Sequence, residues 1–135
     1  MNPELVRDKR IAAFLQLALE EFDPCEQLYA SRPRQAAYFL QQAVEKLLRA
    51  ALEHSGMNAG PTHNIRALCE LLPKQHALKE WFLDFDDMSS AATRFRYPSP
   101  FGALQEVTSD SIERRLAEMR ALDAAVRKHV GKASA

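Results

Sequence analysis

The sequence is poor in several residues on which whole classes of protein depend. It contains four glycines and two cysteines in 135 residues. Cys25 and Cys69 form neither a CxxC pair nor a disulfide framework, which favours reduced, partly buried thiols in a cytoplasmic protein. The chain has no glycine-rich phosphate loop and no nucleophile elbow. Because no apolar run approaches the length of a membrane span, we expect no membrane segment.

Neither positive nor negative charge is in excess. The chain carries 18 Lys and Arg against 18 Asp and Glu, which argues against binding long polyanions by bulk electrostatics. The balance is uneven, because residues 94–135 hold 8 basic and 5 acidic side chains. Arg94 and Arg96 stand where an acidic middle segment meets this basic last third. A small, local phosphate site therefore stays compatible with overall neutrality.

Residues that bind metals are present but not in a pattern that holds an ion. Asp84, Asp86 and Asp87 lack the alternating pattern of a calcium loop and have no histidine three or four residues away. We interpret them as a solvated acidic face or as ion-pair partners of a nearby arginine. His76 and His129 have no partner in sequence and are interpreted as surface or core-edge residues. We expect neither a metal nor a cofactor.

Composition predicts an all-α protein. The chain has 21 Ala and 17 Leu but only 5 Val and 3 Ile, and Ala and Leu favour helix whereas β-branched residues favour strands. Apolar spacing predicts helices over about 2–22, 31–55, 62–72, 75–92 and 110–130. We therefore predict a single-domain antiparallel helical bundle of four to five helices. The domain is expected to cover residues 1–130, followed by a frayed tail over 131–135.

On the second helix, apolar spacing predicts an apolar seam, with Val44, Leu48 and Ala51 beside it, made of Ala36, Leu40, Ala43, Leu47 and Ala50. A polar stripe on another face includes Glu45, the i,i+4 partner of Arg49. The fourth helix is expected to turn Phe82, Phe85 and Met88 inward, and the last helix Ile112, Leu116, Met119, Leu122 and Val126.

Capping residues predict where these helices begin and end. Asn2 is expected to cap the first helix, and Pro24 to end or kink it. Ser31 and Thr62 are expected to cap the second and third helices. Asp110 is expected to open the last one as part of a capping box.

Two segments hold candidate anion ligands. His63 follows the expected cap of the third helix, where exposed N–H groups favour an anion. The alternative is that Thr62 simply caps the helix and His63 packs or hydrogen-bonds locally. Arg94, Arg96 and Tyr97 close the aromatic-rich fourth helix. Two guanidinium groups and a phenol bind phosphate and stack on a base. The alternative is that the arginines satisfy the last carbonyls of the helix and the tyrosine covers the core.

Three motifs resemble those of HEPN domains. The run over 41–50, QQAVEKLLRA, resembles the "QAvEKalKA" helix of that family, and residues 62–65, THNI, resemble its "tHdL" turn. Residues 96–98, RYP, resemble its "RYP" segment. The resemblance spans roughly 11–130 and implies a small helical bundle, commonly a homodimer, that binds nucleotides. It also implies a minimal nucleotidyltransferase partner, often in a toxin–antitoxin pair.

Many HEPN proteins are metal-independent ribonucleases with an Arg-x4–6-His motif near the start of a late helix, and this sequence departs from it. No histidine follows Arg94 or Arg96 at that interval. Arg49 and His54 fit the spacing, but they belong to the second helix. Five helical residues also turn by ~500°, which leaves the two side chains about 140° apart. We interpret this match as chance, so the sequence leans against an enzyme and leaves the question open.

Three functions remain in competition. The first is a noncatalytic HEPN module that binds a nucleotide or RNA phosphate, a nucleotidyltransferase partner, or both. Its predicted ligand contacts are Lys46, Arg49, His63, Arg94, Arg96 and Tyr97. The second is an RNA-cleaving toxin with a rearranged site, in which His63, Arg94 and Arg96 are catalytic. The third is a dimeric helical scaffold without a nucleic-acid role.

Overall fold

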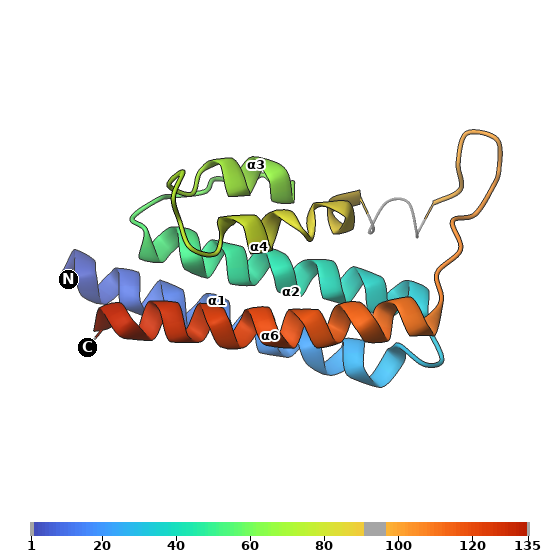
Figure 1. Cartoon of the computed structure of the whole chain (residues 1–135), viewed down its shortest axis with the longest axis horizontal. Helices are drawn as coiled ribbons and strands as arrows, with labels where there is room; N and C mark the ends of the chain where they lie inside the picture. Colours follow the sequence, from blue (N-terminus) through green and yellow to red (C-terminus); the bar gives the residue numbers. More distant parts are fainter. Residues whose placement is uncertain (1, 91–96, 135) are drawn as a thin grey trace.

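The protein is built from helices, as Figure 1 shows in a computed structural model that describes residues 2–90 and 97–134. The long helices are α1 (Pro3–Leu28), α2 (Pro33–His54) and α6 (Ser109–Ser134). The short ones are α3 (Ile65–Glu70), α4 (Lys79–Leu83) and the 3-10 helix η1 (Asp86–Ser90). Because no strand occurs in the described ranges, the all-α prediction is confirmed.

The other helices form two layers, one on each side of α2. In Figure 1, α1 and α6 lie along one side of α2, and α3 and α4 lie across the other. α1 runs antiparallel to α2 and α6, so both chain ends lie at the same end of the bundle. Among the described helices, none combines the length and the apolar character needed to cross a bilayer.

The core is centred on α2 because this helix has neighbours on both sides. The predicted apolar seam is confirmed, since all its members are fully buried: Ala36, Leu40, Ala43, Leu47 and Ala50. Val44, Leu48 and Ala51 beside the seam are fully buried too. A helix covered on two sides also buries some of its polar residues. Gln41 and Glu45 are buried here, so the expectation that Glu45 lies on an exposed polar stripe is wrong.

Helix α1 begins as predicted but ends later. The Asn2 side chain accepts a hydrogen bond from the Glu4 amide, which confirms the cap. Pro24 does not end the helix, which continues to Leu28. Proline lacks an amide donor and costs about 3 kcal/mol in a helix interior. Phe22 and Cys25 on either side of it are buried against the core, and this burial offsets that cost.

Three of the other predicted caps are wrong by one or two residues. Arg32, not Ser31, precedes α2, and its side chain makes no cap bond. Asn64, not Thr62, caps α3 by accepting from the Ala67 amide. Before α6, the Thr108 hydroxyl accepts from the Ser111 amide, so Asp110 is already inside the helix. In each case several neighbouring residues are able to cap, and the fold of the preceding loop decides between them.

The predicted fourth helix, over 75–92, is broken into turns; its residues 91–92 lie outside the described part of the chain. The chain forms α4 and then tighter i to i+3 bonds, such as those from Phe85 to Phe82 and from Met88 to Phe85. Aspartate is a poor helix former, and Asp84, Asp86 and Asp87 fall at this transition. Phe82, Phe85 and Met88 are nevertheless buried as expected.

The C-terminal helix is longer than expected. α6 continues to Ser134. It therefore runs through Gly131, the residue at which the sequence predicts the tail to begin. Its inward face of Ile112, Leu116, Met119, Leu122 and Val126 is buried as predicted.

Candidate functional site: a buried glutamate beside an exposed histidine

The centre of the candidate site is a fully buried carboxylate on α2. Glu45 Oε1 lies 2.5 Å from His63 Nδ1 and 3.8 Å from Arg49 Nη2. Its other oxygen, Oε2, lies 3.5 Å from Lys46 Nζ. We call these four residues the Glu45 cluster. Three of the six predicted ligand contacts, Lys46, Arg49 and His63, thus come together around one acid.

Arg49 holds the loop after α2 in the position that brings His63 to Glu45. Its guanidinium group donates to the carbonyl oxygen of Gly60 at 2.9 Å and to that of Thr62. Gly60 has a φ of 68°, a left-handed conformation that glycine adopts without steric cost. These contacts turn residues 55–64 back over α2. Arg49 is therefore a structural residue of the site rather than a free cation.

The side chains of the Glu45 cluster differ sharply in exposure. The His63 side chain is 77% exposed, whereas those of Lys46 and Arg49 are 20% and 14% exposed. Lys46 also donates to Gln42 Oε1 at 3.2 Å, and Gln42 donates to Gln41 Oε1 at 2.8 Å. Because the lysine and the arginine are occupied within the protein, a ligand that arrives from solvent meets His63 first.

The charges of the buried part of the site are close to balanced. Glu21 on α1 lies within electrostatic reach, and burial raises the pKa of its carboxyl, with further increases from Glu20 and Glu45 and an opposing effect of Lys46. Two carboxylates, Glu21 and Glu45, thus accompany two permanent cations.

The chemistry of the Glu45–His63 contact determines which imidazole nitrogen donates the hydrogen bond. A carboxylate only accepts hydrogen bonds, so Nδ1 is the donor to Glu45. The other nitrogen, Nε2, is then an acceptor in the neutral ring and a donor in the imidazolium form. A buried acid that orients an exposed histidine is suited to anion binding or to proton transfer.

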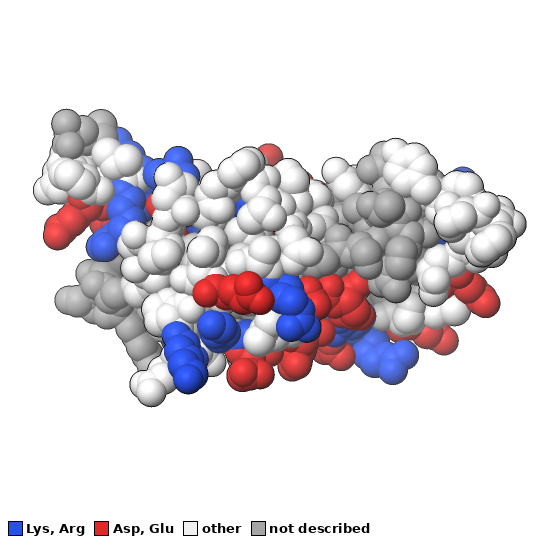
Figure 2. All heavy atoms as spheres, turned by 90° about the horizontal axis from the view of Figure 1, so that it is seen from above, with Lys and Arg blue, Asp and Glu red and all other residues white. Residues whose placement is uncertain are grey.

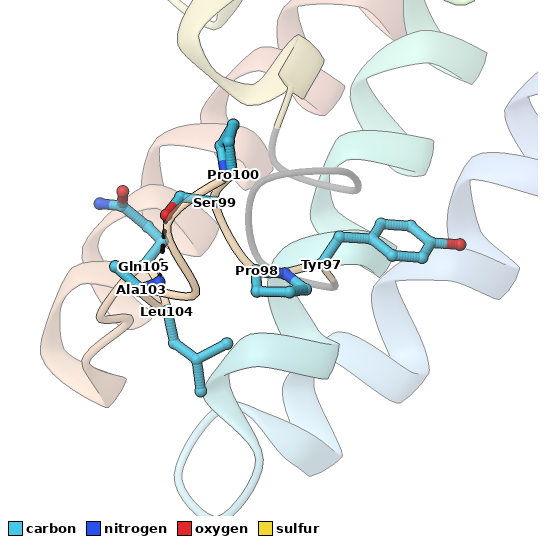
Figure 3. A pocket seen from close by; sticks show the side chains of 7 residues that line it. All are labelled: Tyr97, Pro98, Ser99, Pro100, Ala103, Leu104 and Gln105. Atoms are coloured by element: carbon cyan, nitrogen blue, oxygen red, sulfur yellow. Dashed lines mark hydrogen bonds between the residues drawn. The ribbon is translucent and has the colours of Figure 1, made fainter.

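The remaining predicted site residues do not join the cluster in the part of the chain that is described. Arg94 and Arg96 lie outside the described residues. Tyr97 begins an exposed loop at the end of the bundle where α2 starts (Figures 1 and 3), whereas Glu45 lies midway along α2. Residues 97–105 fold into a turn around Ser99, and a hollow is lined by this segment.

The formal ribonuclease spacing on α2 is not a site. Arg49 contacts the loop before α3, while the ring of His54 packs against that of His129 with centroids 5.1 Å apart. The two side chains thus belong to different clusters, as the helical geometry predicts.

Two of the three aspartates of the fourth segment, Asp86 and Asp87, are ion-pair partners, as one of the two interpretations predicts. Asp86 pairs with Arg66 at 3.1 Å, and Asp87 pairs with Arg115. Arg115 also donates to the Asp84 carbonyl at 3.0 Å and joins η1 to α6. Within the described residues, no group of three His, Cys, Asp or Glu side chains is arranged to hold a metal ion.

The sequence matches the family model of the HEPN domain over residues 12–129. The chain belongs to the HEPN family. The match covers most of the chain and includes the whole of the Glu45 cluster. No curated protein and no solved structure gives a significant match. The assignment to HEPN domains therefore rests on the family model and agrees with the all-α fold.

Sequence reasoning missed the residue at the centre of this HEPN site. From sequence, Glu45 is interpreted as a member of a polar stripe and as the i,i+4 partner of Arg49, and that pair is present at 3.8 Å. One signal was available, because Leu48 and Leu52, at i+3 and i+7, share the face of the helix on which Glu45 lies. A charged residue on an apolar face is buried and needs partners.

Proposed function

We propose that this HEPN domain binds a phosphate group of a nucleotide or an RNA at the Glu45 cluster, with His63 as the contact residue. The observation that supports this most is the pairing of an exposed imidazole with a fully buried carboxylate at 2.5 Å. This pairing holds the ring in one orientation before any ligand arrives, which lowers the entropic cost of binding.

The charge of the site favours an anion once His63 is protonated. The imidazolium Nε2 then donates toward solvent while Nδ1 remains bonded to Glu45. Because the charges behind it are balanced, the extra proton leaves the site with a net positive charge.

The surface also indicates a small ligand rather than a long polyanion. Figure 2 shows acidic and basic side chains mixed along one edge of the molecule, and the described residues on the visible face form no extended basic patch. Long nucleic acids are held by rows of basic residues that neutralise successive phosphates. A single phosphate contact at His63 fits a mononucleotide or one position on an RNA strand better.

The experiment is a calorimetric titration of the protein with ATP and, separately, with a short single-stranded RNA. We expect binding that weakens at least tenfold in His63→Gln, which keeps a polar side chain but cannot become positive. The matched control is Lys9→Gln, which removes an exposed charge on α1. Equal binding by the wild type and His63→Gln would contradict the proposal.

A second candidate function is RNA cleavage without a metal, and the same contact supports it. A histidine oriented by a carboxylate, with its other nitrogen free, is the arrangement of a general base. His63 would remove the proton of a ribose 2′-hydroxyl, whose oxygen would bond to the adjacent phosphorus and displace the 5′-oxygen of the next nucleotide. The imidazolium would return the proton to that leaving oxygen, and Arg94 or Arg96 would stabilise the developing charge. Cleavage that persists with a chelator and is lost in both His63→Ala and Arg96→Ala would establish it. Bound RNA that stays intact would leave binding as the function.

We also propose that the loop at 97–105 contacts another protein chain in a homodimer. This segment contains no charged residue. Phe101 is 97% exposed, and Leu104 and Tyr97 are exposed as well. Apolar side chains gathered at the surface are typical of protein interfaces. Light scattering should show a dimer that Phe101→Ser weakens, and a monomer at all concentrations would contradict this.

The nucleotidyltransferase partner and the toxin–antitoxin role stay predictions that the HEPN resemblance supports. Co-purification from native cells, followed by mass spectrometry, tests both. Recovery of a nucleotidyltransferase would support the partner, and arrest of growth on expression of the chain alone would support a toxin.

A further inference from the structure

The three histidines that do not belong to the Glu45 cluster lie together at one junction of the fold. His54 ends α2, His76 lies between α3 and α4, and His129 lies near the end of α6. The ring centroids of His54 and His129 are 5.1 Å apart, and those of His76 and His129 are 4.7 Å apart. We call this group the histidine junction. It joins two long helices to the connection over 71–78.

The hydrogen bond of His76 requires its ring to be neutral. The Leu78 amide donates to His76 Nδ1 at 3.1 Å, so this nitrogen is an acceptor and the ring proton is on Nε2. In the imidazolium form both ring nitrogens carry a proton. Protonation of His76 would therefore break the bond from Leu78 and place two N–H groups against each other.

The surroundings of the junction offer little to stabilise an added charge. The Nε2 atoms of His54 and His76 are buried and have no hydrogen-bond partner among the described residues. Arg7 on α1 repels a charge on His54, and Asp8 on the same helix attracts it. For His76, the charged groups in reach are the other two imidazoles. Each ring that takes up a proton thus opposes protonation of its neighbours.

The pKa values follow this geometry. Burial lowers the pKa of His54, and His129 and Arg7 lower it further against the opposing effect of Asp8. Burial also lowers the pKa of His76, with further contributions from His129 and His54. The unfolded chain therefore binds protons at a higher pH than the folded one. Stability is unchanged well above the ordinary histidine value and falls as the pH drops through about 6.5.

We propose that the histidine junction is a proton-sensitive latch that releases the connection over 71–78 from the ends of α2 and α6 at acidic pH. This connection links α3 to α4, and its turns depend on bonds such as those from His76 to Pro73 and from Lys79 to His76. Loss of the bond between Leu78 and His76 removes the side-chain contact that closes the last of these turns.

Amide hydrogen exchange tests the latch directly, expressed as protection factors so that the pH dependence of intrinsic exchange is removed. The Leu78 amide, bonded to a histidine, should lose protection between about pH 7.5 and pH 5.5. The Ala67 amide is the matched control, because its partner is the side chain of Asn64, which does not titrate. Equal protection of Leu78 at both pH values, or a parallel loss at both amides, would overturn the proposal.

A titration of the histidine side chains by NMR gives a second test that does not depend on local opening. In the wild type, His54 and His76 should titrate below the midpoint of a histidine in an unstructured peptide. In His129→Gln, which removes the central ring, both midpoints should move upward. Ordinary midpoints in the wild type, or no movement in the variant, would overturn the proposal.

Discussion

The four histidines of this chain occupy two opposite environments. His63 is exposed, and its Nδ1 atom donates to the buried carboxylate of Glu45. His54, His76 and His129 pack on one another, and His76 accepts a bond that only a neutral ring accepts. An added proton gives His63 a second donor that points to solvent, whereas at the histidine junction it breaks a contact. The partners of a histidine, rather than the residue itself, decide whether a proton promotes binding or loosens the fold.

The largest expected effect comes from the acid that creates this difference. Glu45→Gln leaves Lys46 and Arg49 partly buried without their counter-charge, so we expect a loss of about 3 kcal/mol in the free energy of unfolding. Urea denaturation measures it. Glu53→Gln on the same helix is the control, because its partner Arg10 is largely exposed and the pair should contribute less than about 1 kcal/mol. Equal losses in the two variants would remove the distinction between Glu45 and an ordinary surface acid.

A smaller effect is expected at the histidine junction, and only in acid. The wild type should melt at a lower temperature at about pH 5.5 than at about pH 7.5, because the unfolded chain takes up protons that the folded junction resists. In His129→Gln the difference between the two melting temperatures should shrink. If His63→Gln reduces this difference in melting temperature to the same extent, the acid sensitivity does not arise at the histidine junction.

His63→Gln should abolish or strongly weaken ATP binding and lower stability to a smaller extent. The variant removes one hydrogen bond from the fully buried Glu45 carboxylate, so we expect a loss of about 1–2 kcal/mol in the free energy of unfolding, smaller than that of Glu45→Gln. Parallel urea denaturation and calorimetry separate the two. A variant that binds normally but unfolds early would show that His63 only supports the fold.

The smallest expected effect is at Tyr97, which is predicted from sequence to contact the ligand. Tyr97 is exposed and belongs to the loop over 97–105 (Figure 3), which lies at the end of the bundle, away from the middle of α2 (Figure 1). Tyr97→Phe should therefore leave ATP affinity unchanged. A clear loss of affinity would show that this loop completes the site, and the account of a site confined to the Glu45 cluster would be incomplete.

The fold class and the buried faces are predictable from sequence because they depend on repeated patterns. The seam on α2 involves many apolar positions, so a single misread residue does not change the result. Helix ends are less predictable, because each depends on one side chain. Thr62 and Asn64 are both good caps. In the fold Asn64 caps α3, while the Thr62 carbonyl accepts from Arg49 and the Thr62 hydroxyl accepts from the Asn64 amide.

The site is only partly predictable for a related reason. Lys46, Arg49 and His63 are found from sequence as polar residues near helix features, but their common partner is not. Glu45 becomes the centre because α2 is covered on both sides, which is a property of the tertiary fold. The histidine junction is invisible in sequence, since its three members come from distant elements and match no spacing pattern.

Side-chain NMR of the four histidines during addition of ATP tests the central claim most directly. If His63 is the phosphate contact, its ring signals should shift with saturation while those of His54, His76 and His129 stay in place. A His63 signal that does not move while ATP binds would contradict the assignment of the site to the Glu45 cluster.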